Sequence, residues 1–85
     1  MSADRMKPVK LQVNIFAGTW KDVVRFDAAD QANADQVMGA AATLALSSWQ
    51  GRSKFRVAKD DSALPAEPLM EFIPGEGWKE VTNAW

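Results

Sequence analysis

Two stretches of alternating side chains, separated by a very short turn, limit most strongly how this chain can fold. In residues 9–15 every odd position is apolar and the positions between are polar, the pattern of a strand with one buried face. Residues 20–26 repeat the alternation after a turn at residues 17–19, with Val24 and Phe26 on the apolar side. Strands joined by so short a turn pair antiparallel. The sequence therefore predicts a β-hairpin over residues 9–26.

The spacing of apolar residues then changes from two to the three-and-four pattern of a helix. Asp27 is placed to cap the first turn, and Asp30 lies near the positive end of the helix dipole. We predict a helix over residues 27–49 that ends before Gly51. Its predicted sheet-facing side consists of Ala34, Val37, Met38, Ala41, Leu44, Ala45, Ser48 and Trp49.

The remainder returns to short apolar stretches. Lys54–Lys59 and residues 69–73 are expected to be strands, residues 60–68 a loop, and residues 78–82 a last strand after a Pro-Gly turn. This layout is ββαββ, with a fifth strand as an option, in the α+β class: one amphipathic helix packed on an antiparallel sheet in two layers. At 85 residues the chain is expected to be a single domain, with residues 1–7 flexible.

The predicted core combines the apolar sides of the strands and the helix. We expect it to contain Leu11, Val13, Ile15, Val24, Phe26, Val37, Met38, Ala41, Leu44, Ala45, Trp49, Phe55, Val57 and Phe72.

The composition removes most catalytic chemistry. The chain has no Cys and no His, and it also lacks Tyr, so the usual nucleophilic thiol, general base and transition-metal ligands are absent. Asp60 and Asp61 are adjacent, but a Ca²⁺ site needs about 6–8 oxygen ligands in an ordered loop pattern. We therefore expect a protein that is not an enzyme and that needs no metal or cofactor.

Basic residues concentrate on one predicted side of the strands, although the net charge is only −1. That side is expected to carry no acid in the first three strands. One interpretation is that these charges keep an open sheet soluble; the other is that they contact an anionic partner. The residues concerned are Lys10, Lys21, Arg25, Lys54 and Arg56.

Four tryptophans in so short a chain raise the question of a binding surface. Trp20 and Trp78 each follow a turn, where one side of the ring can pack and the N–H can meet water. Trp85 is the last residue, so it either folds back onto the core or docks on another chain. We list Trp20, Trp78 and Trp85 with the basic residues as candidate partner-binding positions.

The segment from Lys10 to Asp27, followed by an Ala-rich helix, resembles small accessory proteins of phage and prophage genomes. The likeness covers about a third of the chain and contains no chemically specific motif. It implies a bacterial cytoplasm and an accessory role, and it implies no catalytic residue.

Three functions are compatible with these observations. We rank first a non-enzymatic module that binds a protein, with a second copy of itself as one candidate partner. The alternative is a binder of nucleic-acid phosphates through the basic side of the sheet. The third is a carboxylate-based enzyme or a hard-metal binder. No membrane partner is expected, and the absence of Cys and of an export signal favours the cytoplasm.

Overall fold

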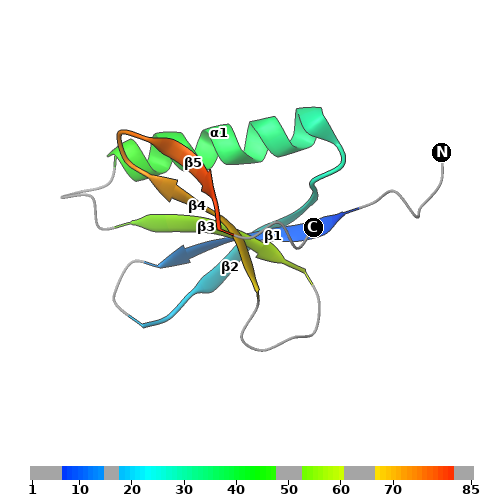
Figure 1. The fold of residues 1–85 in the computed structure, drawn as a ribbon, viewed down its shortest axis with the longest axis horizontal. Helices are drawn as coiled ribbons and strands as arrows, with labels where there is room; N and C mark the ends of the chain where they lie inside the picture. Colours follow the sequence, from blue (N-terminus) through cyan, green and yellow to red (C-terminus); the bar gives the residue numbers. More distant parts are fainter. Residues whose placement is uncertain (1–6, 15–17, 48–52, 61–66, 82–85) are drawn as a thin grey trace.

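The computed structural model of this chain describes residues 7–14, 18–47, 53–60 and 67–81 (Figure 1). Within these residues a β-hairpin comes first, followed by one helix and then by three further strands. The elements are β1 (Pro8–Asn14), β2 (Lys21–Asp27), α1 (Gln31–Ser47), β3 (Lys54–Lys59), β4 (Pro68–Ile73) and β5 (Gly77–Glu80).

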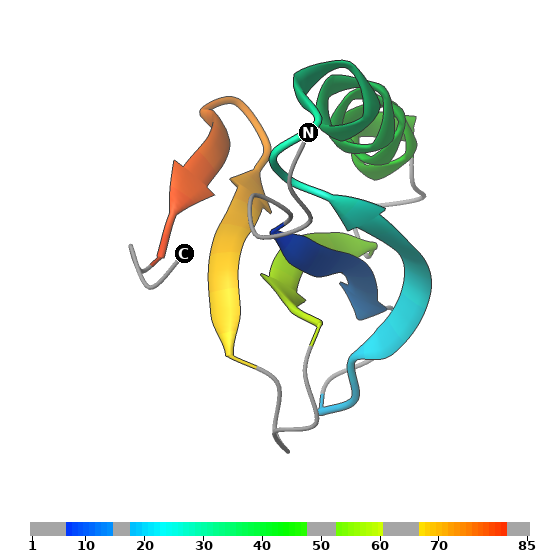
Figure 2. The same ribbon diagram turned by 90° about the vertical axis from the view of Figure 1, so that its right-hand side faces the viewer.

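The strands form one antiparallel sheet in the order β2-β1-β3-β4-β5, so β1 lies inside the sheet and β2 and β5 are its outermost strands. Figure 2 looks nearly along α1 and shows the helix on one side of this curved sheet. The α+β class and the packing of one helix on an antiparallel sheet are confirmed. The element order is ββαβββ rather than ββαββ, because the optional fifth strand forms: residues 77–80 pair with β4.

The turn between β4 and β5 explains why this last strand forms. Gly75 and Gly77 have φ angles of 88° and 87°, which residues with a Cβ atom rarely adopt. The N–H of Glu76 donates to the carbonyl of Ile73 at 2.9 Å and closes the turn. Trp78 therefore comes to lie opposite Phe72 in the ladder.

The helix begins later than predicted, because Asp30 and not Asp27 is its N-cap. The Asp30 carboxylate accepts a hydrogen bond from the N–H of Asn33 at 3.2 Å, and its carbonyl accepts from Ala34 at 2.9 Å. Asp27 instead ends β2, where its carboxylate accepts from the N–H groups of Lys7 and Ala29. The predicted helix end at residues 48–49 lies outside the described residues.

Most of the predicted core is confirmed. Leu11, Phe26, Ala41, Ala45, Phe55 and Val57 are buried, and Val13, Val37, Met38 and Phe72 pack partly buried against them. The predicted Ile15 and Trp49 lie outside the described residues. Val9, Ala34 and Leu69 complete the buried cluster.

Two predicted core residues are wrong. Leu44 is 58% exposed, because α1 contacts the sheet through a buried stripe of alanines that includes Ala41 and Ala45. Leu44 directly precedes Ala45 and so lies about 100° away from it around the helix axis. Val24 is 42% exposed, because it lies on the outermost strand β2, which has a strand neighbour on one side only.

Candidate functional site

The side chains of β1 divide between the two faces of the sheet. Val9 and Leu11 belong to the core beneath α1, so Lys10 and Gln12 point to the opposite face, which we call the outer face. Both are buried, with exposed fractions of 7% and 4%. The predicted exposure of Lys10 is therefore wrong: a charged residue of an inner strand is covered by its neighbours on the curved sheet.

An irregularity in β2 brings an acid to this face. Leu11 pairs with Val24, but the next residue, Gln12, pairs with Asp22, so Val23 is an extra residue in the strand. The carboxylate of Asp22 consequently lies 3.5 Å from the Lys10 ammonium and accepts a 2.8 Å hydrogen bond from Gln12. The expectation of an outer face without acids is wrong, because strict alternation would have placed Asp22 on the side of the helix.

A row of polar contacts continues from Gln12 across to β3. The Nε group of Arg56 donates to Oε1 of Gln12 at 2.8 Å, and the guanidinium carbon lies 4.2 Å from the centre of the Trp20 ring. We call Lys10, Gln12, Trp20, Asp22 and Arg56 the outer-face network. It is built on β1, β2 and β3 and joins three of the predicted basic or aromatic site residues.

The network changes the ionisation of two of its members. The hydrogen bond from Gln12 is the main cause that lowers the pKa of Asp22, and the ammonium of Lys10 adds to this effect. Burial lowers the pKa of the Arg56 guanidinium, against the opposing influence of the Glu71 carboxylate. Arginine nevertheless stays charged near neutral pH, so the outer face holds fixed charges of both signs.

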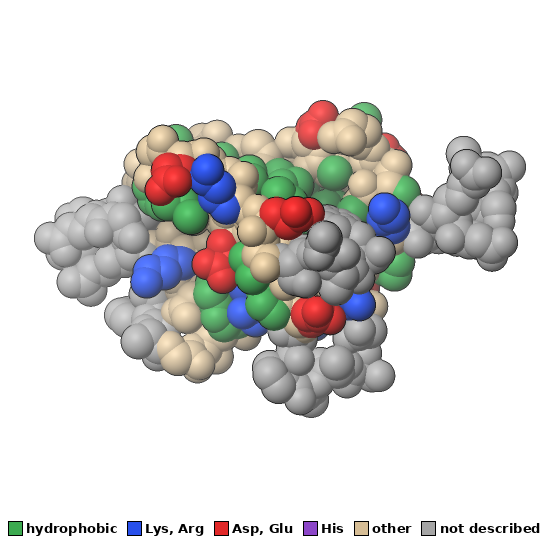
Figure 3. Space-filling view, in the orientation of Figure 1, with side chains coloured by type: hydrophobic (Ala, Val, Ile, Leu, Met, Phe, Trp, Pro, Cys, Tyr) green, Lys and Arg blue, Asp and Glu red, His purple; other side chains and the backbone are tan. Residues whose placement is uncertain are grey.

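The other predicted basic residues are placed differently. Arg25 forms an ion pair with Asp60 at 3.2 Å, whereas Lys21 and Lys54 are exposed and have no ion pair in the described part of the chain. Acidic and basic side chains are interspersed on the face that Figure 3 displays. The structure therefore does not bring the five predicted basic residues together as one uniformly positive patch.

Trp78 packs within the fold of this chain. Its Nε1 group donates to the main-chain carbonyl of Met38 at 3.1 Å, and its ring meets Phe72 edge-on with centroids 5.5 Å apart. Trp78 thus packs against the core on the helix side of the sheet. Trp85 lies outside the described residues.

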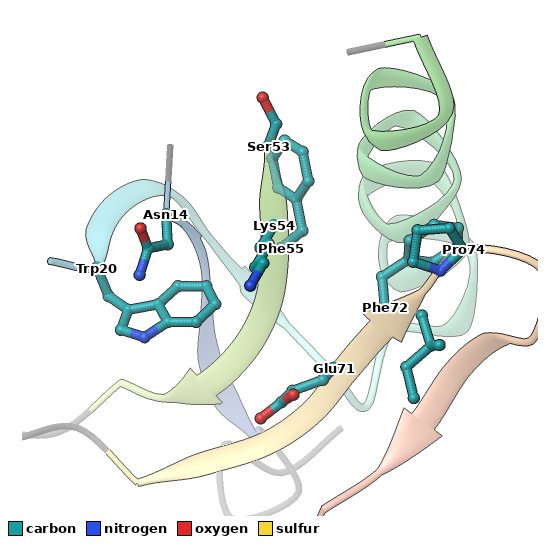
Figure 4. A pocket seen from close by; sticks show the side chains of 9 residues that line it. Asn14, Trp20, Ser53, Lys54, Phe55, Glu71, Phe72 and Pro74 are labelled. Atoms are coloured by element: carbon teal, nitrogen blue, oxygen red, sulfur yellow. The ribbon is translucent and has the colours of Figure 1, made fainter. Parts of the chain in front are cut away.

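A groove opens where β3 and β4 separate. Their ladder pairs Arg56 with Glu71 but extends no further toward the start of β3, so Lys54 and Phe55 have no partner in β4. Figure 4 shows the two strands diverging at this point, with Trp20 and Asn14 on one side of β3. The space measures about 390 Å³, and we call it the β3–β4 groove. It is lined by Asn14, Trp20, Ser53, Lys54, Phe55, Glu71, Phe72, Ile73 and Pro74.

The groove combines an apolar lining with a few charges. Phe55 and Phe72 belong to or pack against the core, and Ile73 is 37% exposed. Lys54 comes from one strand and Glu71 from the other, and no ion pair is recorded between them. Such a lining can hold an apolar side chain while polar groups at its edge orient the rest of a ligand. Sequence reasoning found Trp20 and Lys54 but missed the other residues, because the divergence of β3 and β4 has no signal in the sequence.

The described residues offer little for metal chemistry. They contain no group of three or more acidic side chains that could hold a metal ion. Asp60 is engaged with Arg25, while the neighbouring Asp61 lies outside the described residues. In the same part of the chain, no helix has both the length and the apolar character needed to cross a membrane.

Comparisons with protein-family models, with curated proteins and with solved structures find no match to this chain.

Proposed function

We propose that this chain is a non-enzymatic protein-interaction module that binds an extended segment of a protein partner in the β3–β4 groove. The observation that carries the proposal is the groove itself, where the pairing of β3 and β4 ends and core aromatic residues line an open space. Residues 54 and 55 of β3 are paired with β1 on one side only, and such an unpaired strand edge can pair with an added peptide while an adjacent apolar pocket holds one of its side chains. The ring of Trp20 forms one side of the groove, and tryptophan is among the residue types most enriched at the hot spots of protein interfaces.

The charges of the outer face favour this function over phosphate binding. A protein that binds nucleic-acid backbone needs several cations free to replace counterions. Here Lys10 and Arg25 are paired with Asp22 and Asp60, and Arg56 is hydrogen-bonded to a glutamine. A protein partner that inserts an apolar side chain into the groove does not need several unpaired cations and therefore fits this surface better.

The experiment is a selection of binders from a random-sequence peptide library against the immobilised full chain. The groove variant is Ile73→Asp, and the matched control is Val81→Asp, since both residues are exposed and Val81 lies beside Leu69 at the other end of β4. We expect selected peptides to bind the groove variant about tenfold more weakly and the control with unchanged affinity. Thermal melts establish that both variants remain folded.

Two results would contradict the proposal. One is a selection that enriches no peptide over the background. The other is a set of peptides whose affinity falls equally in both variants, because the binding surface would then lie elsewhere on the chain.

A further inference from the structure

We infer that the partner segment carries an acidic side chain beside its apolar anchor and that Lys54, with Arg56 next to it, receives this carboxylate. The inference rests on the proposed function and specifies the chemistry of the partner. The inference follows from a comparison of the charged side chains that already form ion pairs with those near the groove that do not.

Half of the eight basic residues in the described part of the chain form ion pairs with acids. Lys10, Arg25, Lys59 and Lys79 each lie within 3.5 Å of a carboxylate oxygen. Lys54 has no such partner among the described residues, although it lines the groove and is exposed. Its ammonium is therefore available to an anion that enters the groove.

Arg56 strengthens the positive field at the same place. It lies two positions after Lys54 on β3, so both side chains project from the outer face. The hydrogen bond to Gln12 uses its Nε group, and contact with Trp20 holds the plane of the guanidinium. Its two terminal Nη groups have no hydrogen-bond acceptor among the described residues. An arginine oriented in this way is prepared to donate to a carboxylate without a large loss of side-chain freedom.

Glu71 is the one acid among the described residues that line the groove, and it does not neutralise both cations. It lies opposite Arg56 in the ladder and favours the charged form of that guanidinium, but it forms no ion pair with it. Among the described residues, Lys54 and Glu71 line the groove and Arg56 lies beside it, so positive charge exceeds negative charge there. The complementary ligand is an anion with an apolar neighbour, which in an extended peptide means an Asp or Glu on the same side as the anchor. Side chains two positions apart share a side and lie about 7 Å from each other.

The experiment repeats the peptide selection with Lys54→Glu and with Lys21→Glu as the matched control. Lys21 is also exposed, but it lies opposite the core residue Val13 in the ladder and so projects from the helix side of the sheet, away from the outer face of Lys54. We expect the unchanged protein and the control to select peptides with an acid two positions from an apolar residue. The Lys54→Glu protein should select basic peptides instead. The best acidic peptide should bind Lys54→Glu about five- to tenfold more weakly, and replacing its acid with the amide should remove most of that difference.

The outcomes separate this inference from the proposed function. Apolar peptides that lose affinity in Ile73→Asp but show no charge preference would overturn the acidic partner and leave the protein-binding groove intact. A selection without any enriched peptide would overturn both. A single-stranded oligonucleotide that displaces the peptides and loses affinity in Lys54→Glu would also overturn the inference, because the anion would then be a phosphate.

Discussion

The indole Nε1 of Trp78 lies 3.1 Å from the main-chain carbonyl oxygen of Met38, and this hydrogen bond joins the outermost strand β5 to the middle of α1. The two residues are 40 positions apart in the chain. A short terminal strand that pairs only with β4 is thereby held from a second direction.

The first prediction concerns this contact. Trp78→Phe keeps a ring against Phe72 but removes the donor, so we expect a loss of about 0.5–1.5 kcal/mol in the free energy of unfolding. Trp78→Ala removes the ring as well and should cost about 3–5 kcal/mol. Urea denaturation followed by circular dichroism measures both. Equal losses in the two variants would mean that the hydrogen bond, rather than the ring, provides the whole contribution.

The second prediction contrasts two leucines. Leu69 is fully buried, and replacing it with alanine should cost about 2–5 kcal/mol through lost burial and the cavity left behind. Leu44 is 58% exposed, and the same substitution there should change stability by less than about 0.5 kcal/mol. Urea denaturation of the two variants tests this contrast. A large loss on changing Leu44 would require α1 to be rotated about its axis relative to the structure.

The third prediction concerns the start of the helix. Asp30→Ala removes the side-chain acceptor of the N–H of Asn33 and should cost about 1 kcal/mol of stability. Asp35→Ala, on the exposed side of the same helix, is the matched control and should have a smaller effect. Thermal melts of the two variants make the comparison. If Asp35→Ala were the more damaging change, Asp30 would not be the N-cap.

The fourth prediction is a pH dependence. The folded protein holds the pKa of Asp22 below its unfolded value of about 3.9, so the ionised carboxylate stabilises the fold above that pH. This contribution is lost as the pH falls through the lower, folded value. We expect the urea midpoint to decrease less between pH 7 and pH 3 in Asp22→Asn than in the unchanged protein. Glu80→Gln is the control, and it should show the full decrease; an equal decrease in Asp22→Asn would exclude a stabilising role for this carboxylate.

The sequence allowed the hairpin, the helix and the α+β class to be predicted, because alternation and helical spacing record directly which side of an element is buried. The predicted sheet-facing side of the helix correctly included Ala34, Ala41 and Ala45, which are buried, but it was too wide. A pattern of hydrophobicity also counts Leu44 as a core residue, although Leu44 is 58% exposed. Small side chains allow close approach to a sheet, and this geometric preference outweighs the greater hydrophobicity of leucine.

The candidate site was predicted only in part. Trp20, Lys54 and Arg56 stand out in the sequence by residue type, but their arrangement depends on contacts between distant strands. Gln12 was overlooked because an amide between apolar residues is usually a solvent-facing position, and here it links Asp22 to Arg56. The end of the β3–β4 ladder depends on how the whole sheet curves, which no local pattern encodes.

The extra residue Val23 has a consequence for tracing the ancestry of this chain. Leu11 pairs with Val24 and Gln12 pairs with Asp22, so Val23 itself has no partner in β1. A homologue that lacks Val23 could therefore keep both pairings. A gap inside a strand is usually treated as a sign that an alignment is wrong. At this position, however, two related chains can differ by one inserted or deleted residue and still share the same fold. A sequence alignment that penalises this gap heavily would fail to recognise such chains as homologues.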